Sequence, residues 1–359
     1  MPCRRALSTI SAFDVGSRRY PMDSITQGLL GAVVAECGFR DRLGRGAVLL
    51  GAVGGVLPDA DILLSAVDPW WSWQYHRHFT HSVFFAPLVA VPLAWLFWRA
   101  RGRRRFGLWF LCAWLAIATH PLLDLCTSYG TEFFVPVSGA RLGFDWIAII
   151  DPVYSLILAV ALLACLVRWR RNPSAGTVYI GWCGLLLSTA YIGYGAWNQH
   201  GALKRLYRSA EARGHHVLAA RAIPQLGSVY VWRLIYRTRT GYYVGRTNTL
   251  FDGDPNFRHL PFEEHPLIRE ADRLPRVQRF GHFTMGWARP HVVRMPFGWS
   301  VVYDDLRYSW RPDEVRSLWS VVVDFDRDGR VAAVRRIGAG RNGSVGEMLR
   351  SVWREIRRP

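Results

Sequence analysis

Lysine is almost absent from this 359-residue chain. Lys204 is the only lysine among 45 basic residues, and the formal net charge is +18 at pH 7. A strongly basic chain can bind nucleic acid or anionic lipid. The sequence has no RNA- or DNA-binding motif and no basic helix interleaved with aromatic residues. We therefore expect no nucleic-acid partner, and we expect the positive charge to attract the phospholipid headgroups of a membrane.

The chain also lacks the features of a disulfide framework and of a signal peptide. Its six cysteines form no CxxC pair, and none lies beyond Cys183. Most of them sit in apolar segments, where cysteine behaves as a small hydrophobic residue. Residues 1–21 contain serine and arginine but no apolar core of the kind that a signal peptide has. We treat residues 1–21 as an N-terminal extension, with Met22 as an alternative start.

Apolar sequence, in contrast, is abundant. Half of all residues are hydrophobic, and nearly all long apolar runs lie before residue 200. A membrane-spanning helix needs about 20 apolar residues, or about 17 at the low end. Four runs meet this requirement: 82–98, 106–123, 147–168 and 177–197. Two earlier runs, 24–38 and 46–67, are short or interrupted. We predict an α-helical polytopic membrane bundle of about four to six apolar helices over residues 22–200.

Arginine-rich segments separate the apolar runs and orient them. They lie at residues 40–45, 99–105 and 168–171. The positive-inside rule places all three in the cytoplasm, although the arginines of the N-terminal extension mildly oppose this. The chain beyond residue 198 then lies outside. We predict a multi-pass protein of the bacterial inner membrane with a periplasmic C-terminal domain.

Residues 201–359 have a different pattern. Segments such as VYVWRLIYRT and LWSVVVDF are rich in β-branched and aromatic residues between turn signals. We predict a small, mostly antiparallel β domain of the α+β class, outside the membrane, with a C-terminal helix near 343–356. The stretch from Asp324 to Gly329 begins like a calcium-binding loop, but its twelfth position is Arg335 rather than glutamate. We therefore interpret this stretch as a hairpin turn.

Few ionisable side chains interrupt the apolar half, and the predicted topology places them all at its outer face. A carboxylate at membrane depth costs about 2.5–3.5 kcal/mol, and a divalent cation would offset that cost. Histidine nitrogen and carboxylate oxygen together suit zinc, with manganese or iron as alternatives. His120 and Asp124 are four residues apart, so a helix places them on one face. The predicted metal site comprises His76, His81, His120, Asp124 and Asp59 or Asp61.

Several neighbouring residues also have a purely structural interpretation. A lone histidine at a membrane interface is ordinarily a hydrogen-bonded structural group, and this is how we interpret His78 taken by itself. Asp145 can simply pair with Arg141. The two aspartates of the LPDAD stretch can cap a helix.

Five motifs in order also resemble a known family. MDSITQGLLGAVVAE, GxxPDAD, HRHFTHS, THPLLDLCTSYGT and DWIAIIDPVYS are similar to the LexA-regulated, inner-membrane metal-dependent hydrolases of the YdjM type, over residues 22–170. The region after residue 220 is similar to the extension of the longer members. The chain departs at His78, where glycine is usual, and at Gln27, where some members carry histidine. The functional positions that the resemblance implies are Asp59, Asp61, His76, His81, His120 and Asp124.

The family also has a more distant similarity to zinc-dependent phospholipase C, which points to phosphoester chemistry. We therefore expect metal-dependent hydrolysis of a phosphoester, or of a lipid or envelope ester, at the outer face of the membrane. Asp61 or Asp151 would act as the base, and Arg77 and Ser82 would bind the substrate.

Two alternatives remain at this point. One is a non-catalytic stress-response membrane protein with a structural metal site, which a closed shell of four protein ligands would favour. The other is a transporter, which would need polar residues on both sides of the membrane. The sequence has them on one side only.

Overall fold

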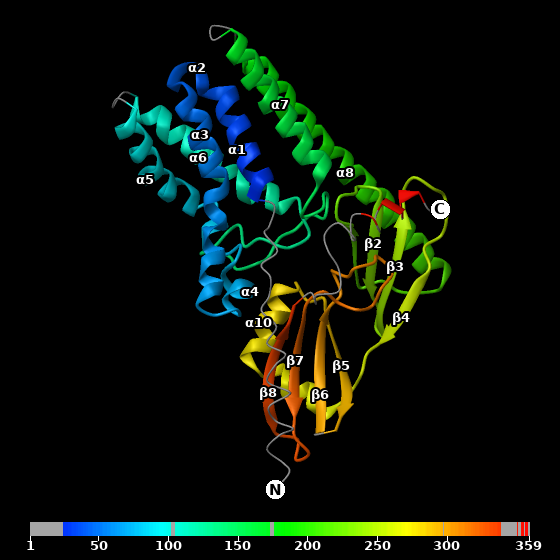
Figure 1. The fold of residues 1–359 in the computed structure, drawn as a ribbon. Coiled ribbons are helices and arrows are strands. Elements are labelled where there is room, and N and C mark those ends of the chain that lie inside the picture. Colours follow the sequence, from blue (N-terminus) through cyan, green and yellow to red (C-terminus); the bar gives the residue numbers. More distant parts are fainter. Residues whose placement is uncertain are drawn as a thin grey trace.

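The chain folds into a helical half and a strand-rich half that meet along the loop between helices α6 (Phe106–Leu125) and α7 (Pro152–Arg171) (Figure 1). The computed structural model describes residues 24–101, 105–172, 176–296 and 298–338, with residues 350, 353, 354, 356 and 357 near the C-terminus. The predicted C-terminal helix at 343–356 lies largely outside the described residues.

Close packing of small residues holds the centre of the helical half together. Helix α1 (Ser24–Gly38) lies against α3 (Arg45–Val56), to which the short α2 (Arg40–Leu43) connects it. A side chain at either Gly31 or Gly51 would overlap the backbone of the other. Membrane helices lack a hydrophobic driving force between them and associate through such close approaches.

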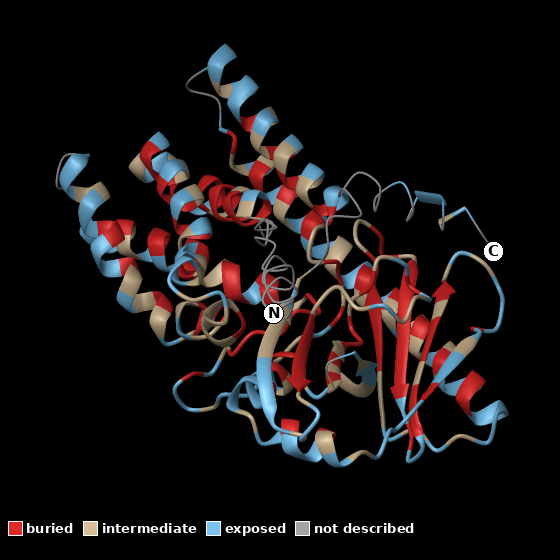
Figure 2. Cartoon of the chain, turned by 60° about the horizontal axis from the view of Figure 1, so that its bottom comes forward, coloured by how far each residue is buried: buried red, intermediate tan, exposed pale blue. Residues whose placement is uncertain are grey.

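Three helical segments are long and apolar enough to cross a membrane, or four if a bent pair is one span. They are α3 continued by the 3-10 helix η2 (Leu57–Ala66), α6, and α7. The bent pair joins Trp71–His81, which contains α4 (Trp71–Tyr75) and η3 (Phe79–His81), to α5 (Phe85–Ala100) at an angle of 74°. Many large apolar side chains on these helices are exposed, as Figure 2 shows for their outer sides. This is the surface that a bilayer covers.

The predicted count of four to six spans is therefore not confirmed. The run at 46–67, which we predicted to be interrupted, qualifies because η2 continues α3 through Pro58. The run at 147–168 becomes helical only at Pro152. The run at 177–197 lies in the long α8 (Val178–Ala212), which is not among the candidate spans. Glycine, tyrosine, serine and threonine dilute its apolar residues.

The arginine-rich connections gather at one end of the helical half, and the strands lie beyond the other end (Figure 1). Arg40 donates a hydrogen bond to Thr177 at 2.6 Å, which joins the α1–α3 connection to the α7–α8 connection. The guanidinium of Arg45 lies 3.2 Å from the ring centroid of Trp169.

The strands form two antiparallel four-stranded sheets within the described residues, as the alternating pattern predicted. The first has the order β1 (Ala219–Pro224), β2 (Val231–Arg237), β3 (Gly241–Asn248), β4 (Phe257–Pro261). The second has the order β5 (Ala288–Met295), β6 (Gly298–Asp305), β7 (Ser320–Phe325), β8 (Val331–Ile337). Helices α9 (Pro266–Asp272) and α10 (Pro275–Phe283) connect the sheets. The stretch at Asp326–Gly329 is the predicted turn, between β7 and β8.

The two halves share one hydrophobic core. Trp73 of α4 and Tyr129 of the loop after α6 pack with Phe280 and Phe283 of α10 and with the buried face of the second sheet. The rings of Trp73 and Phe283 are stacked with centroids 5.5 Å apart. The strand-rich half therefore packs directly against α4 and the loop after α6.

Candidate metal centre

Three segments of the helical half bring ionisable side chains together at its inner boundary with the strands. Helix η2 supplies Asp59 and Asp61, the turn between α4 and α5 supplies His81, and α6 supplies His120 and Asp124. All five side chains are buried. The spacing of four residues places His120 and Asp124 on one face of α6, as the sequence predicted.

A carboxylate oxygen from each of two aspartates lies beside a pair of histidine nitrogens. His81 Nε2 and His120 Nε2 are 3.0 Å apart. Asp59 Oδ1 lies 3.6 Å and 3.3 Å from these two nitrogens, and Asp124 Oδ2 lies 3.3 Å and 3.6 Å from them. Ligands placed tetrahedrally at about 2.05 Å from a zinc ion are about 3.3 Å from one another. The two nitrogens lie at such separations from each other and from either carboxylate oxygen, and Asp59, His81 and His120 form a group that could hold an ion.

The hydrogen bonds behind the two histidines fix which nitrogen carries the proton. His120 Nδ1 lies 2.6 Å from the carbonyl oxygen of Gly55, which can only accept a hydrogen bond. The hydroxyl of Thr80 donates to Asp61, so the Thr80 oxygen accepts from His81 Nδ1 at 2.9 Å. Both neutral rings then present a bare lone pair at Nε2. A cation between them would satisfy two lone pairs that face each other beside two carboxylates.

The charge of the cluster leads to the same conclusion. Asp59, Asp61 and Asp124 are buried with one guanidinium, that of Arg77, whose Nη2 lies 2.9 Å from Asp124 Oδ1. Counted as full charges with neutral histidines, the set carries two negative charges more than positive ones. Uncompensated buried charge is strongly unfavourable. A divalent cation would neutralise this set.

Each of the two converging carboxylates is held by its other oxygen. Ser24 donates to Asp59 Oδ2 at 2.8 Å, and Gln27 donates to Asp124 Oδ1 at 3.0 Å. Asp124 Oδ2 has no hydrogen-bond partner among the described residues. The role of Gln27 as an orienting donor is one that we missed in the sequence. A buried amide on the otherwise apolar face of α1 was the available signal.

The structure separates the remaining histidines of HRHFTHS. His76 Nδ1 lies 2.7 Å from Asp61 Oδ1, and its Nε2 is buried without a partner in the described part of the chain. His78 is outside the cluster, partly exposed, with Nε2 3.5 Å from Glu132 Oε2. Arg77, between them, has a left-handed backbone with φ of 61° that turns its side chain inward.

Of two other predicted residues, Asp151 caps a helix and Ser82 bonds to a distant backbone carbonyl. Asp151 accepts hydrogen bonds from the backbone nitrogens of Val153 and Tyr154 at the start of α7, and from the Tyr191 hydroxyl. Ser82 Oγ donates to the Val135 carbonyl oxygen. Asp145 does not pair with Arg141. It binds Arg221 of β1, with an Nη2–Oδ1 distance of 2.6 Å.

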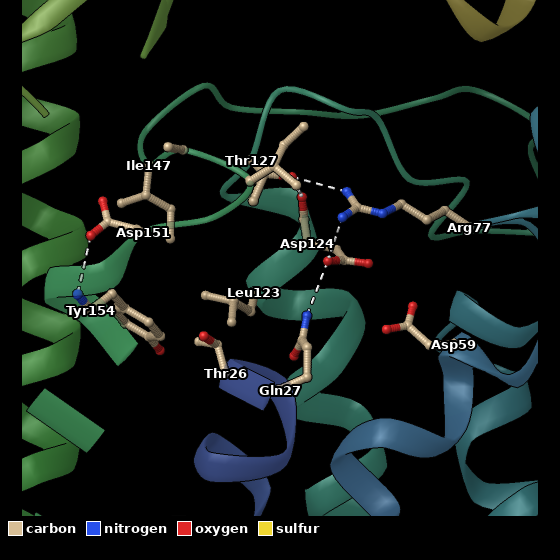
Figure 3. Close-up of a pocket in the computed structure, with 12 residues that line it drawn as sticks. Thr26, Gln27, Asp59, Arg77, Leu123, Asp124, Thr127, Ile147, Asp151 and Tyr154 are labelled. Atoms are coloured by element: carbon tan, nitrogen blue, oxygen red, sulfur yellow. Dashed lines mark hydrogen bonds and ion pairs between the residues drawn. The ribbon is translucent and has the colours of Figure 1, made fainter. Parts of the chain in front are cut away.

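A small pocket adjoins the carboxylates of Asp59 and Asp124 (Figure 3). Its volume is about 20 Å³, enough for roughly one water molecule. Asp59, Arg77, Asp124 and Thr127 line one side, and Asp151 lies across from Asp59. Arg77 Nη1 donates to Thr127 at 2.9 Å, while its Nε is buried without a partner among the described residues.

Comparison with known proteins adds a family. A family model described as YdjM inner membrane protein matches residues 22–200, which contain every residue of the metal centre. The chain therefore belongs to the YdjM inner membrane protein family. No curated protein and no solved structure matches the chain.

Proposed function

From this membership and the convergence of donors, we propose that the protein is a membrane-bound, metal-dependent hydrolase. Its ion would be held by Asp59, His81, His120 and Asp124. The observation that carries the proposal is the set of separations, 3.0–3.6 Å, of two buried histidine nitrogens from each other and from one oxygen each of Asp59 and Asp124. Zinc suits two imidazoles and two carboxylates, and manganese or iron are the alternatives.

Asp61 and His76 would orient the centre. Asp61 Oδ2 lies 3.4 Å from His81 Nδ1, and Asp61 Oδ1 lies 2.7 Å from His76 Nδ1. A carboxylate behind a ligating histidine fixes the ring and raises its basicity. His76 remains a candidate for a further ligand through its partnerless Nε2.

The pocket would hold the reacting water. A bound divalent ion lowers the pKa of water to about 7 and polarises a phosphoryl or carbonyl oxygen. Of the two bases predicted from the sequence, Asp151 lines this pocket and Asp61 does not. Asp151 is thus the better candidate to take a proton. Arg77 also lines the pocket and would stabilise an oxyanion of the substrate, whereas the Ser82 hydroxyl is engaged by Val135.

The centre would work on the periplasmic side. The arginine-rich connections lie at the end of the helical half remote from the donors, and the positive-inside rule assigns that end to the cytoplasm. A phosphatase that is active only in the periplasm, fused after residue 338, should be active. An inactive fusion in a normally inserted protein would reverse the orientation.

A structural metal site is the second candidate, and the four converging donors themselves favour it. Structural zinc sites are closed by four protein ligands, whereas catalytic sites keep a position open. The protein substituted with cobalt(II) distinguishes the two. An open site should change its visible spectrum when inorganic phosphate is added, and a closed site should not.

The proposal is tested by metal content and turnover together. Protein purified in mild detergent without chelator should contain one divalent ion per chain and hydrolyse bis(4-nitrophenyl) phosphate or a 4-nitrophenyl ester. His120→Ala should lose both properties. A metal-loaded protein with no turnover and a spectrum insensitive to phosphate would support the structural alternative. Metal-free wild-type protein would contradict both.

A further inference from the structure

An apolar groove of about 420 Å³ lies along α1 and α3 and reaches Leu162 of α7, separate from the pocket beside the candidate metal centre. Ser24, Ile25, Gly28 and Leu29 of α1 line it, with Ala52 and Val56 of α3. Helix α3 is part of a candidate membrane span, and Ile25 and Val56 are exposed. The groove is thus at membrane depth, where the surrounding medium is the hydrocarbon of lipid tails.

The groove and the metal centre meet at one hydrogen bond. Ser24 lines the groove and donates at 2.8 Å to Asp59 Oδ2, while Asp59 Oδ1 faces the two histidine nitrogens. Thr26 and Gln27, in the same turn of α1, line the pocket instead. The first turn of α1 therefore has an apolar groove on one side and the polar pocket on the other.

We propose that this groove holds the hydrocarbon chain of the substrate, which is a membrane lipid whose phosphoester or ester lies at the metal centre. This inference rests on the proposed hydrolase function and names its substrate class. A water-soluble substrate would have no use for an apolar groove that ends at a metal ligand.

The groove positions the lipid rather than supplying much affinity. A chain that moves from the bilayer into the groove exchanges one apolar environment for another, so little hydrophobic free energy is gained. Holding the chain beside Ser24 fixes where the polar end of the lipid lies. Such positioning lowers the entropy that must be lost before reaction.

The first test maps the lipid in the intact protein. Wild-type protein is placed in vesicles of phosphatidylethanolamine and phosphatidylglycerol that contain a phosphatidylglycerol with a diazirine on one acyl chain. After illumination, crosslinks should concentrate on Leu29, Ala52 and Val56. Crosslinks spread evenly over other lipid-facing residues, such as Leu96 and Leu163, would overturn the proposal. So would groove labelling that appears only after residues 1–21 are removed, because the chain itself would then occupy the groove.

Two neighbouring substitutions supply a matched comparison. Ala52→Phe fills the groove, whereas Val53→Phe adds the same ring to an exposed neighbour that does not line it. Ala52→Phe should reduce groove crosslinking and hydrolysis of the lipid by about tenfold, which is equivalent to about 1.4 kcal/mol. Hydrolysis of bis(4-nitrophenyl) phosphate, which has no chain, should stay unchanged. Val53→Phe should alter neither.

Metal content measured on the same samples separates this inference from the proposed function. Wild-type protein that lacks metal and turnover refutes the hydrolase, whatever the crosslinks show. Protein that keeps metal and hydrolyses the small phosphodiester, but loses nothing on Ala52→Phe, refutes the groove alone. If Ala52→Phe loses metal, the wild-type crosslink map decides the question.

Discussion

The two halves of the protein neutralise buried charge in different ways. In the strand-rich half, buried acids have guanidinium partners from the chain itself. Arg307 lies 2.8 Å from Asp305, with both side chains fully buried, and Arg335 lies 2.6 Å from Asp324. In the helical half, Asp59 has no guanidinium within ion-pair distance among the described residues. These acids of the strand-rich half are thus paired within the chain, whereas Asp59 belongs to a group of acceptors that could hold a metal ion.

The two halves are nevertheless joined by direct contacts. Arg307 Nη1 donates to the carbonyl oxygen of Tyr129 at 2.9 Å, and the Tyr129 ring lies 4.8 Å from the guanidinium of Arg77. Arg221 binds the Ser128 carbonyl oxygen at 3.2 Å. These contacts hold the loop that directly follows Asp124. The pattern of the sequence changes near residue 200, but these contacts join the two folded halves.

The largest effect should come from removing a donor of the centre. His81→Ala should abolish stoichiometric metal binding, because a ligand must be a deprotonated donor at a fixed position. Elemental analysis of purified protein measures this. His78→Gly is the control and should retain the ion, since His78 contacts Glu132 instead of the cluster. Full metal in His81→Ala, with loss only in His78→Gly, would mean that the wrong histidine was assigned.

The next effect concerns the Arg–Asp ion pairs of the strand-rich half. Arg307→Leu leaves Asp305 buried without its partner, so the free energy of unfolding should fall by about 3–5 kcal/mol. Thermal unfolding followed by tryptophan fluorescence measures the change. Arg335→Leu is the comparison and should cost less, because the Arg335 side chain is 40% exposed and Asp324 keeps its hydrogen bond from Ser300. Equal shifts for the two variants would contradict the distinction between buried and exposed pairs.

Local pattern explains what could be predicted from the sequence. The alternation in segments such as Val231–Arg237 predicted antiparallel strands, and the spacing of His120 and Asp124 predicted their shared helix face. The topology argument placed Asp59 and His81 at the same membrane face, where the structure brings them together. Each inference used only neighbouring residues or the order of apolar runs.

Contacts between distant residues could not be predicted in this way. Arg307 and Tyr129 are 178 positions apart, and Arg221 and Asp145 are 76 apart. Neither pair carries a periodic signal. The span count was not confirmed for a related reason. Hydropathy alone cannot tell that α8 extends as one long helix from Val178 to Ala212, where it packs against the first sheet.

A smaller effect should follow from loosening the support of the donors. Asp61→Asn removes the charge behind His81 and His76, and should reduce metal affinity about 10–100-fold. Competition with a chromophoric chelator measures the change. Asp151→Asn is the comparison, since Asp151 caps α7 and accepts a hydrogen bond from the Tyr191 hydroxyl. Its metal affinity should be unchanged, and a tenfold loss there would make Asp151 part of the metal support.

The smallest effect is a pH dependence at the seam between the halves. Glu132 binds Arg141 of its own loop and His282 of α10, each at 3.1 Å. Burial by itself would raise the pKa of Glu132, but the hydrogen bond from His282 and the charge of Arg141 outweigh it and hold this pKa below its usual value. A lowered pKa in the folded state stabilises the protein fully above the unfolded value of 4.5, and this contribution is lost as the pH falls through the folded pKa.

Wild-type protein should therefore lose stability more steeply below about pH 4.5 than Glu132→Gln does, with a difference of about 1–3 kcal/mol above that pH. Melting temperatures of both proteins from pH 7 to pH 3 measure the difference, and Glu211→Gln, an exposed residue of α8, is the control. His282 of α10 in the strand-rich half binds Glu132 in the loop after Asp124, so His282→Ala should remove part of the same stability difference. Parallel melting curves for wild type and Glu132→Gln would mean that this contact contributes nothing to the attachment of the two halves.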